Sequence, residues 1–154
     1  RSGAYEVDFS PHVDQIDAGP ETIGPVVRVE DEAVLIDSLI LCKFLRGVFE
    51  DRVAGMAELL QPVTGWDVTP EELLETAGRI VTAKKAYNIA QGWTPAEDTL
   101  PPRFFGELPD EGESAGARID PVRLAAQVEA YNLARGWTAE GYVPGERLAA
   151  LGLD

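Results

Sequence analysis

The sequence predicts an all-α fold, an irregular multi-helix domain with a loop-rich N-terminal segment and proline-rich connections. Three observations favour it: apolar residues recur at helical spacing, capping residues precede two of the apolar stretches, and no stretch alternates as a β-strand does. Residues 1–29 are rich in Gly and Pro and are expected to be loops, and residues 30–154 are expected to form the helical domain. A length of 154 residues suits one domain, and a chain that begins at Arg1 is expected to be a fragment or a processed product.

The first helix is expected over residues 30–49, where apolar side chains follow helical spacing. Acidic residues 30–32 would then lie at its positively polarised start. Leucines at positions 35, 41 and 45 widen the apolar surface until it nearly encircles the helix, which predicts deep burial. A shorter helix over residues 53–60 is expected to stop at Pro62, so that Gly65–Trp66 lacks a preceding helix.

The best-marked helix start is Thr69–Pro70, with Thr at the N-cap, Pro at the first helical position and Glu72 completing a capping box. This helix is expected to run to Gln91. Asp120–Pro121 begins another that continues to Arg135, and a last short helix over residues 146–151 is expected to end at Gly152. Residues 95–119 form the proline-rich connection between the two long helices.

Two stretches near the helix ends are almost identical, AYNIAQGWT at residues 86–94 and AYNLARGWT at residues 130–138. Gly92 and Gly136 fall just after their helices, where a left-handed residue closes the last turn. Each following tryptophan is expected to fold back onto the tyrosine six residues before it. The expected pairs are Tyr87 with Trp93 and Tyr131 with Trp137. The repeat therefore indicates a duplicated helix terminator rather than a duplicated active site.

The composition limits the function. Thirteen basic and 27 acidic residues give a net charge of −14, which argues against nucleic acid or an anionic membrane as a partner. No apolar run is long enough to span a membrane and no signal peptide opens the chain, so a cytoplasmic location is expected. One cysteine, Cys42, and one histidine, His12, exclude a self-contained zinc finger and an internal disulfide. His12 is expected on the surface, as are the charges of Lys84, Lys85 and Arg103.

The stretch DSLILC at residues 37–42 is the part of the chain that is not purely structural in character. An aspartate within an apolar helix is costly to bury unless it is hydrogen-bonded, and Cys42 lies one and a half turns beyond Asp37. From the residues alone two interpretations stay open. Either the pair carries chemistry, or Asp37 is on an exposed edge and Cys42 is a small core residue.

Three stretches, in order, resemble motifs of the aldehyde ferredoxin oxidoreductase family of tungsten–pterin enzymes. DSLILC is similar to the family's D-x-x-G-L-C signature, and GWTPAEDTLPPR at residues 92–103 is similar to its G-[FW]-[TS]-x-x-[DE]-D-x-L-P-x-R segment. YNLARGWT at residues 131–138, followed by Gly141 and Pro144, resembles the Y-x-x-R-G-W-D-x-x-G-x-P ending. The motifs extend along most of residues 28–154.

The resemblance implies that residues 30–154 are the C-terminal domain of a larger enzyme, inactive in isolation and without a catalytic residue of its own. It implies that Asp37 and Leu41 hydrogen-bond a molybdopterin, and that Cys42 is one of four thiolates on a [4Fe-4S] cluster. The other three thiolates would come from a C-x-x-C-x-x-x-C run earlier in the polypeptide. Ile40 stands where the family usually has glycine, and its branched side chain removes the close backbone approach that glycine allows.

The whole enzyme implied by the resemblance oxidises aldehydes to carboxylic acids at a tungsten (or molybdenum) bis-molybdopterin centre. Electrons would pass through the [4Fe-4S] cluster to ferredoxin or a similar acceptor, and the domain's nearest partners would be the N-terminal domains of the same enzyme. Two alternatives stay open. One is a non-catalytic acidic helical interaction domain that has lost cofactor binding, which Ile40 favours, and the other is a relative that acts on aromatic acyl thioesters.

Overall fold

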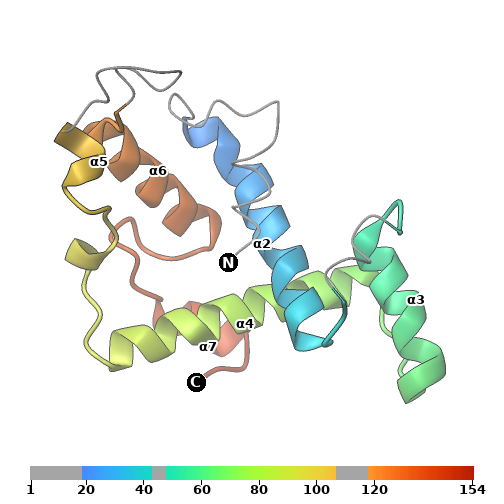
Figure 1. Ribbon diagram of the computed structural model, residues 1–154. Helices are drawn as coiled ribbons and strands as arrows, with labels where there is room; N and C mark the ends of the chain where they lie inside the picture. Colours follow the sequence, from blue (N-terminus) through green and yellow to red (C-terminus); the bar gives the residue numbers. More distant parts are fainter. Residues whose placement is uncertain (1–18, 43–47, 107–117) are drawn as a thin grey trace.

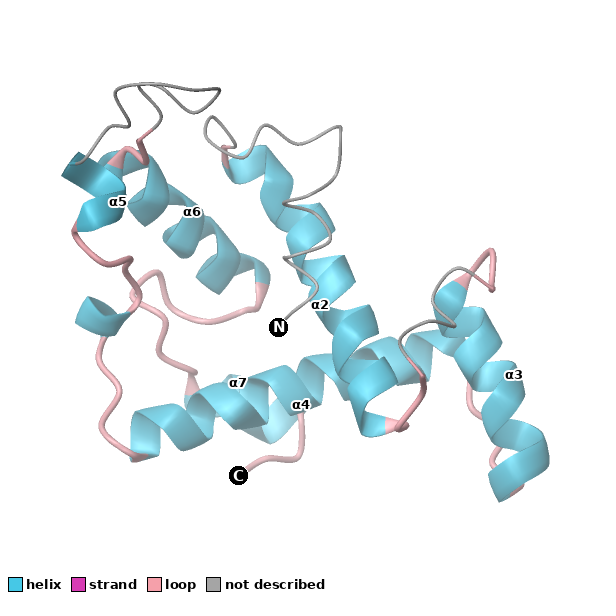
Figure 2. Ribbon diagram, viewed as in Figure 1, coloured by secondary structure: helices cyan, strands magenta, loops and turns pink. Residues whose placement is uncertain are grey.

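The computed structural model describes residues 19–42, 48–106 and 118–154, and within them it contains helices and no strand (Figures 1 and 2). The prediction of an all-α, irregular multi-helix domain is confirmed, and His12 lies outside the described residues. The elements are η1 (Pro20–Thr22), α2 (Ile23–Ser38), α3 (Arg52–Thr64), α4 (Pro70–Ala90), η3 (Pro95–Glu97), α5 (Arg103–Gly106), α6 (Pro121–Ala134) and α7 (Gly145–Ala150).

Helix α2 is the central element of the fold, because it packs against α4 and also against α6. Figure 1 shows α2 crossing the long α4 helix, with α3 against one end of α4 and α6 beside α2. Adjacent residues of α2 serve two apolar clusters. The larger apolar cluster contains Leu35, Ile36, Val53, Met56, Ala57, Leu73 and Ala77, and the smaller one contains Val34, Val81 and Trp137. In the part of the chain described here, no helix is both long and apolar enough to cross a membrane.

Helix α2 begins at Ile23 and not at Glu30, so the expected boundary between residues 29 and 30 falls inside a helix. Gly24 and Pro25 were expected to break regular structure. They lie instead in the first helical turn, where Pro is tolerated because the backbone N–H groups have no intrahelical acceptor. The acidic residues 30–32 are consequently in the middle of α2, and the prediction that they lie at a helix start is wrong.

The end of α2 also differs from the prediction, which continued the helix to residue 49. Regular structure stops at Ser38, and Ile40 adopts a left-handed conformation with φ of 56°. The Leu41 N–H donates to the Ile36 carbonyl at 3.0 Å and the Ile40 N–H donates to the Asp37 carbonyl at 3.3 Å. These two bonds form a Schellman motif, the usual way to close an α-helix. The predicted continuation over residues 43–47 lies outside the described residues.

Helix α3 starts at the N-cap Asp51, whose carboxylate accepts from the N–H groups of Val53 and Ala54 at 3.0 Å. It runs past Pro62 to Thr64, so the prediction that it stops at Pro62 is wrong. Gly65 then closes it with φ of 76° and an N–H donated to the Gln61 carbonyl at 2.8 Å. The Gly65–Trp66 pair therefore follows a helix, as the other two Gly–Trp pairs do.

The caps of the two long helices are as predicted. Thr69 and Glu72 form a capping box at the start of α4, and the Asp120 carboxylate accepts the Val122 N–H at the start of α6. Gly92 and Gly136 are left-handed, with φ of 98° and 73°. After Gly92 the Trp93 N–H donates to the Asn88 carbonyl, and after Gly136 the Trp137 N–H donates to the Asn132 carbonyl. Both helices thus end in the same Schellman geometry.

One of the two expected aromatic pairs forms. The rings of Tyr131 and Trp137 meet edge to face with centroids 5.8 Å apart, as predicted. Trp93 packs instead on Tyr142, also at 5.8 Å, while Tyr87 remains 65% exposed. The reason is the loop after α6, which passes the end of α4: a Cβ on Gly141 would lie 3.0 Å from the Trp93 ring. The Trp93 side chain, which follows Gly92 at the end of α4, therefore packs on the loop that follows the second repeat.

Replacing either helix-closing glycine by valine is expected to lower the free energy of unfolding. A β-branched residue forced into a left-handed turn costs about 1–2 kcal/mol. Gly136→Val should lower the free energy of unfolding more than Gly92→Val. An added Cβ at position 136 would lie 3.3 Å from the Arg147 side chain, whereas one at position 92 would meet nothing within 4 Å. Urea denaturation followed by circular dichroism measures both. A neutral result for either variant would contradict the terminator interpretation.

Candidate functional site

The turn at the end of α2 brings the three predicted cofactor residues together. Asp37 and Cys42 are exposed, and Leu41 is half-buried between them, packed against the larger apolar cluster. The interpretation of Cys42 as a small core residue is wrong, whereas the exposed position of Asp37 fits either interpretation made from the sequence. The turn therefore exposes a carboxylate and a thiol, while the Leu41 side chain anchors it to the larger apolar cluster.

The donors on this turn suit a contribution to a shared cofactor rather than a complete site. Groups of three or more His, Cys, Asp or Glu side chains able to hold a metal are absent from the described residues. The single exposed thiol of Cys42 can supply one thiolate, and a Cys₄ cluster needs three more from elsewhere. Because the Leu41 N–H is donated to the Ile36 carbonyl, a backbone hydrogen bond from Leu41 to a ligand would use its carbonyl oxygen. The residues fit the groups that the resemblance implies.

A buried arginine fixes the position of α2 relative to α6. The guanidinium of Arg135, whose side chain is 4% exposed, donates to Asp31 at 2.6 Å and to Glu30 at 2.5 Å. It also donates to the Val27 carbonyl and, through Nε, to the Tyr131 hydroxyl at 3.2 Å. The Tyr131 hydroxyl in turn donates to Glu30 at 2.5 Å. All of these bonds except the one between Arg135 and Tyr131 join residues more than 100 positions apart, and together they satisfy charges that would otherwise be costly to bury.

Burial is the main cause of the shifted pKa values of Tyr131 and Asp31 in this network. Burial raises the pKa of the Tyr131 hydroxyl, and the neighbouring Glu30 carboxylate raises it further despite the opposing charge of Arg135. Tyr131 therefore stays protonated and acts as a donor. Burial also raises the pKa of Asp31, with the hydrogen bond from Arg135 lowering it in part. The arginine thus compensates the cost of keeping an acidic group between two helices.

The third acid of this stretch of α2 connects a different helix. Glu32 is 7% exposed and accepts from Arg28 within α2 at 3.1 Å and from Arg52 at the start of α3 at 3.0 Å. Acidic residues 30–32 are therefore paired with cations from α2, from α3 and from the residue that caps the C-terminus of α6. These ion pairs hold α2, whose C-terminal turn carries residues 37–42, against the neighbouring helices. This contact explains why the acids lie in the middle of the helix.

Lys85 is not the surface charge that the sequence suggested. Its side chain is 11% exposed, its ammonium lies 3.1 Å from the centre of the Trp93 ring, and it donates to Asp98 at 3.2 Å. The Trp93 indole N–H donates to the same carboxylate at 3.2 Å. The cation–π contact and the ion pair hold the loop around η3 against the end of α4. This loop belongs to the second of the three motif-like stretches.

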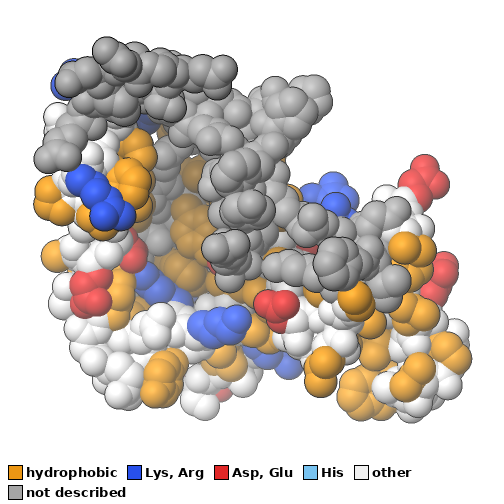
Figure 3. Space-filling model, viewed as in Figure 1, with side chains coloured by type: hydrophobic (Ala, Val, Ile, Leu, Met, Phe, Trp, Pro, Cys, Tyr) orange, Lys and Arg blue, Asp and Glu red, His pale blue; other side chains and the backbone are white. Residues whose placement is uncertain are grey.

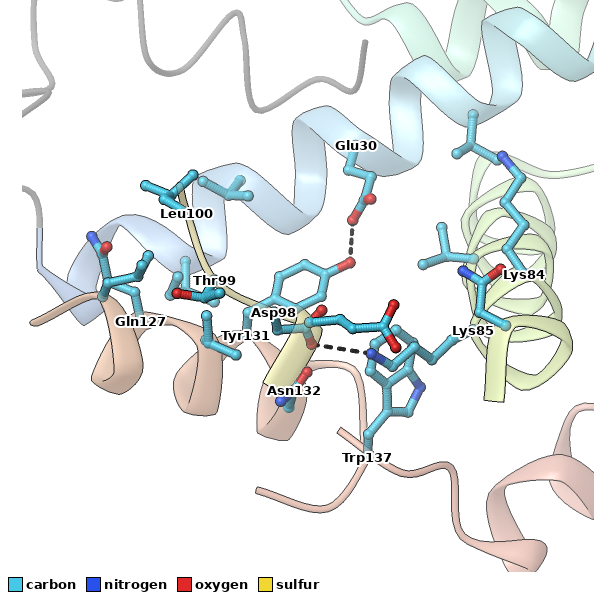
Figure 4. Close-up of a pocket in the computed structure, with 18 residues that line it drawn as sticks. Glu30, Lys84, Lys85, Asp98, Thr99, Leu100, Gln127, Tyr131, Asn132 and Trp137 are labelled. Atoms are coloured by element: carbon cyan, nitrogen blue, oxygen red, sulfur yellow. Dashed lines mark hydrogen bonds and ion pairs between the residues drawn. The ribbon is translucent and has the colours of Figure 1, made fainter. Parts of the chain in front are cut away.

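A cavity of about 560 Å³ lies between α2, α4, α6 and the η3 loop, and Figure 3 shows the hollow with apolar side chains inside it. Figure 4 shows two pairs of polar side chains in its wall: Tyr131 donates to Glu30, and Lys85 donates to Asp98. The rest of the wall is mainly apolar. Its apolar members include Ile23, Val26, Val34, Val81, Leu100, Leu124 and Val128. The cavity therefore offers a ligand mostly hydrophobic contact.

Sequence reasoning missed Arg135 and Lys85. The signal available for Arg135 was the repeat itself, in which Gln91 occupies the equivalent position and is exposed while Arg135 is buried. A charged residue that differs between two otherwise matching helix ends is a candidate for a contact that only one of them makes. Lys85 carries no such signal, because its tryptophan and aspartate partners come together only in the folded chain.

The fold and the turn define a helical domain with an exposed thiol and an exposed carboxylate at the end of α2. Comparison with known sequences identifies its family. Residues 3–153 match the model of the family described as aldehyde ferredoxin oxidoreductase, domains 2 and 3. The chain therefore belongs to the aldehyde ferredoxin oxidoreductase family.

Curated relatives carry the name tungsten-containing aldehyde ferredoxin oxidoreductase. The Pyrococcus furiosus protein is 35% identical over 150 residues, the Pyrococcus horikoshii protein 33% over 151 residues, and the Thermococcus kodakarensis protein 33% over 150 residues. In each comparison the match covers 97% of this chain and 23% of the relative. The chain thus spans about a quarter of the length of the relatives that it matches, and this stretch corresponds to one part of a larger polypeptide.

Proposed function

We propose that this chain is the C-terminal cofactor-binding domain of an enzyme that oxidises aldehydes to carboxylic acids. The observation that carries the proposal is the turn of residues 37–42, which resembles the family signature at every specified position except Ile40 and leaves Cys42 exposed just after a hydrogen-bonded helix end. When bound, a tungsten (or molybdenum) bis-molybdopterin centre would supply the two-electron oxidation, and a [4Fe-4S] cluster would supply electron transfer to ferredoxin.

Each residue of the turn has a role in this proposal. Cys42 ligates the cluster through its thiolate, and the Asp37 carboxylate and the Leu41 carbonyl accept hydrogen bonds from the pterin. Arg135 is a positioning residue, because its bonds to Glu30 and Asp31 hold α2 in place. This chain contributes no catalytic residue, which suits a domain that binds cofactors at its edge.

The conformation of Ile40 supports cofactor binding against the alternative of an interaction domain that has lost it. That alternative depended on a branched residue at the family's glycine position. Ile40 nevertheless adopts the left-handed conformation that glycine would favour, with φ of 56°, and both Schellman hydrogen bonds form. The backbone of the turn therefore adopts a conformation that a glycine at position 40 would also adopt, which supports the proposal that this turn follows the family signature.

The proposed partners are the N-terminal domains of the same enzyme and ferredoxin or a similar acceptor. The relatives' additional length supports the first, since the match covers 23% of their sequences. The three missing cluster thiolates would belong to those domains. A cytoplasmic location is part of the proposal, because thiolate ligands need a compartment that keeps cysteine reduced.

The test uses the complete polypeptide, purified without oxygen and analysed for tungsten, molybdenum and iron. We expect stoichiometric tungsten or molybdenum, and aldehyde-dependent reduction of ferredoxin. Asp37→Asn should lower the pterin and tungsten content several-fold, whereas Asp67→Asn, at an exposed aspartate outside the turn, should leave it unchanged. A protein without tungsten and molybdenum would contradict the proposal, and turnover of aromatic acyl thioesters but not aldehydes would assign the cofactors to the other reaction.

A further inference from the structure

We infer that Ile40 is a hydrophobic cover for the cluster held at Cys42, excluding water from it and thereby setting its reduction potential. The inference rests on the proposed function, since it needs the cluster to be present. It goes beyond that function by giving a role to a residue that neither ligates nor hydrogen-bonds.

Ile40 is held in a conformation that its side chain disfavours. Its φ of 56° is the one positive value at a non-glycine residue within the described chain. For a β-branched residue the left-handed region brings Cβ too close to the following carbonyl oxygen, so such a residue is a true outlier. The turn itself needs a left-handed residue at this place, since two hydrogen bonds close the helix around it. Glycine would meet that need without strain.

The described chain offers no compensation for the strain. The Ile40 side chain is 91% exposed, whereas its neighbours Leu39 and Leu41 pack against the larger apolar cluster. An isoleucine here therefore loses backbone freedom and gains no burial in return. A strained residue of this kind persists at functional sites, where the side chain makes a contact that repays the strain. We therefore expect such a contact with a group outside the described residues.

The position of Ile40 indicates which group that is. It lies two residues before Cys42, whose thiol is exposed, and three residues after Asp37, whose carboxylate is exposed. A group bound through Cys42 would therefore lie within two residues of an exposed apolar side chain of four carbons. Solvent exposure is one of the factors that set the potential of an iron–sulfur cluster, and the hydrophobic residues around a metal control it. Water stabilises the more negative, reduced form, so a cover lowers the potential.

The experiment compares holoenzyme variants by redox titration with dithionite, which gives one electron to the cluster, followed by electron paramagnetic resonance. Ile40→Gly removes the cover and the strain, Ile40→Asn removes the apolar character but tolerates the left-handed conformation, and Ile40→Leu keeps the apolar bulk. We expect the midpoint potential to shift to more positive values in Ile40→Gly and Ile40→Asn, with Ile40→Leu close to wild type. Bleaching of the cluster by an iron chelator should be several-fold faster in the first two.

Two results would overturn the inference. A potential and a bleaching rate in Ile40→Gly equal to those of wild type would show that the side chain does not cover the cluster. A shift of equal size in Ile40→Leu would assign the effect to the shape of the turn. Failure of the proposed function is distinguishable, because then the reduced wild-type enzyme gives no cluster signal at all.

Discussion

Arg135→Ala is expected to lower the free energy of unfolding by about 3–5 kcal/mol, because it removes one partner from a buried charge network. The change leaves Glu30 and Asp31 side by side, 21% and 13% exposed, without the cation between them. It also removes the donor to Tyr131 Oη. Guanidinium denaturation of wild type and variant gives the difference directly.

A matched control is available on α4. Arg79 is exposed, and Arg79→Ala should change the unfolding free energy by no more than about 0.5 kcal/mol. Arg135→Lys keeps the charge but loses the planar guanidinium that pairs with two carboxylates. Its loss of unfolding free energy should lie between those of Arg79→Ala and Arg135→Ala. A loss of less than about 1 kcal/mol in Arg135→Ala would mean that the network does not fix α6 to α2.

Leu35→Ala is expected to cost about 2–5 kcal/mol, the range for truncating a fully buried leucine. Leu35 is 2% exposed and lies in the larger apolar cluster, against which Leu39 and Leu41 also pack. The resulting cavity would therefore lie directly beneath the turn that carries Cys42. Thermal unfolding of the variant measures the loss.

Two further variants separate volume from position. Leu35→Met keeps the volume and should cost less than about 1.5 kcal/mol. Val63→Ala shortens a side chain that is 83% exposed and should change stability by no more than about 0.5 kcal/mol. Equal losses for Leu35→Ala and Leu35→Met would point to an effect other than the cavity.

Local signals in the sequence predicted the helix ends that depend on local hydrogen bonds. Thr69 with Glu72, Asp120, and the glycines at 92, 136 and 152 each act within a few residues of their own position. Because a cap is a contact between near neighbours, its spacing in the sequence is enough to recognise it. The all-α fold could be predicted for the same reason.

The limits of α2 could not be predicted from local signals. Gly24 and Pro25 are residue types that predict a break in regular structure, but the first turn of a helix tolerates both. Ile40 is a residue type that predicts a continuing helix, but it closes α2 in a left-handed conformation that isoleucine rarely adopts.

The candidate site divides in the same way. The turn residues Asp37, Leu41 and Cys42 were found because a contiguous motif carries them. The residues that hold the turn's helix were not, since Arg135 meets Asp31 across 104 positions and no spacing rule links them. Lys85 was assigned to the surface because the residues around it in the sequence do not indicate that its ammonium lies between the Trp93 and Trp137 rings.

The measurement that tests the central claim most directly is the iron content of the complete polypeptide carrying Cys42→Ala. Alanine cannot ligate iron, and Ser38→Ala, at an exposed position in the same turn region, is the matched control. We expect wild type and Ser38→Ala to hold equal iron and the same signal after reduction, and Cys42→Ala to lose most of the iron or to give an altered cluster signal. Full iron with an unchanged signal in Cys42→Ala would contradict the assignment of this chain as a cluster-binding domain.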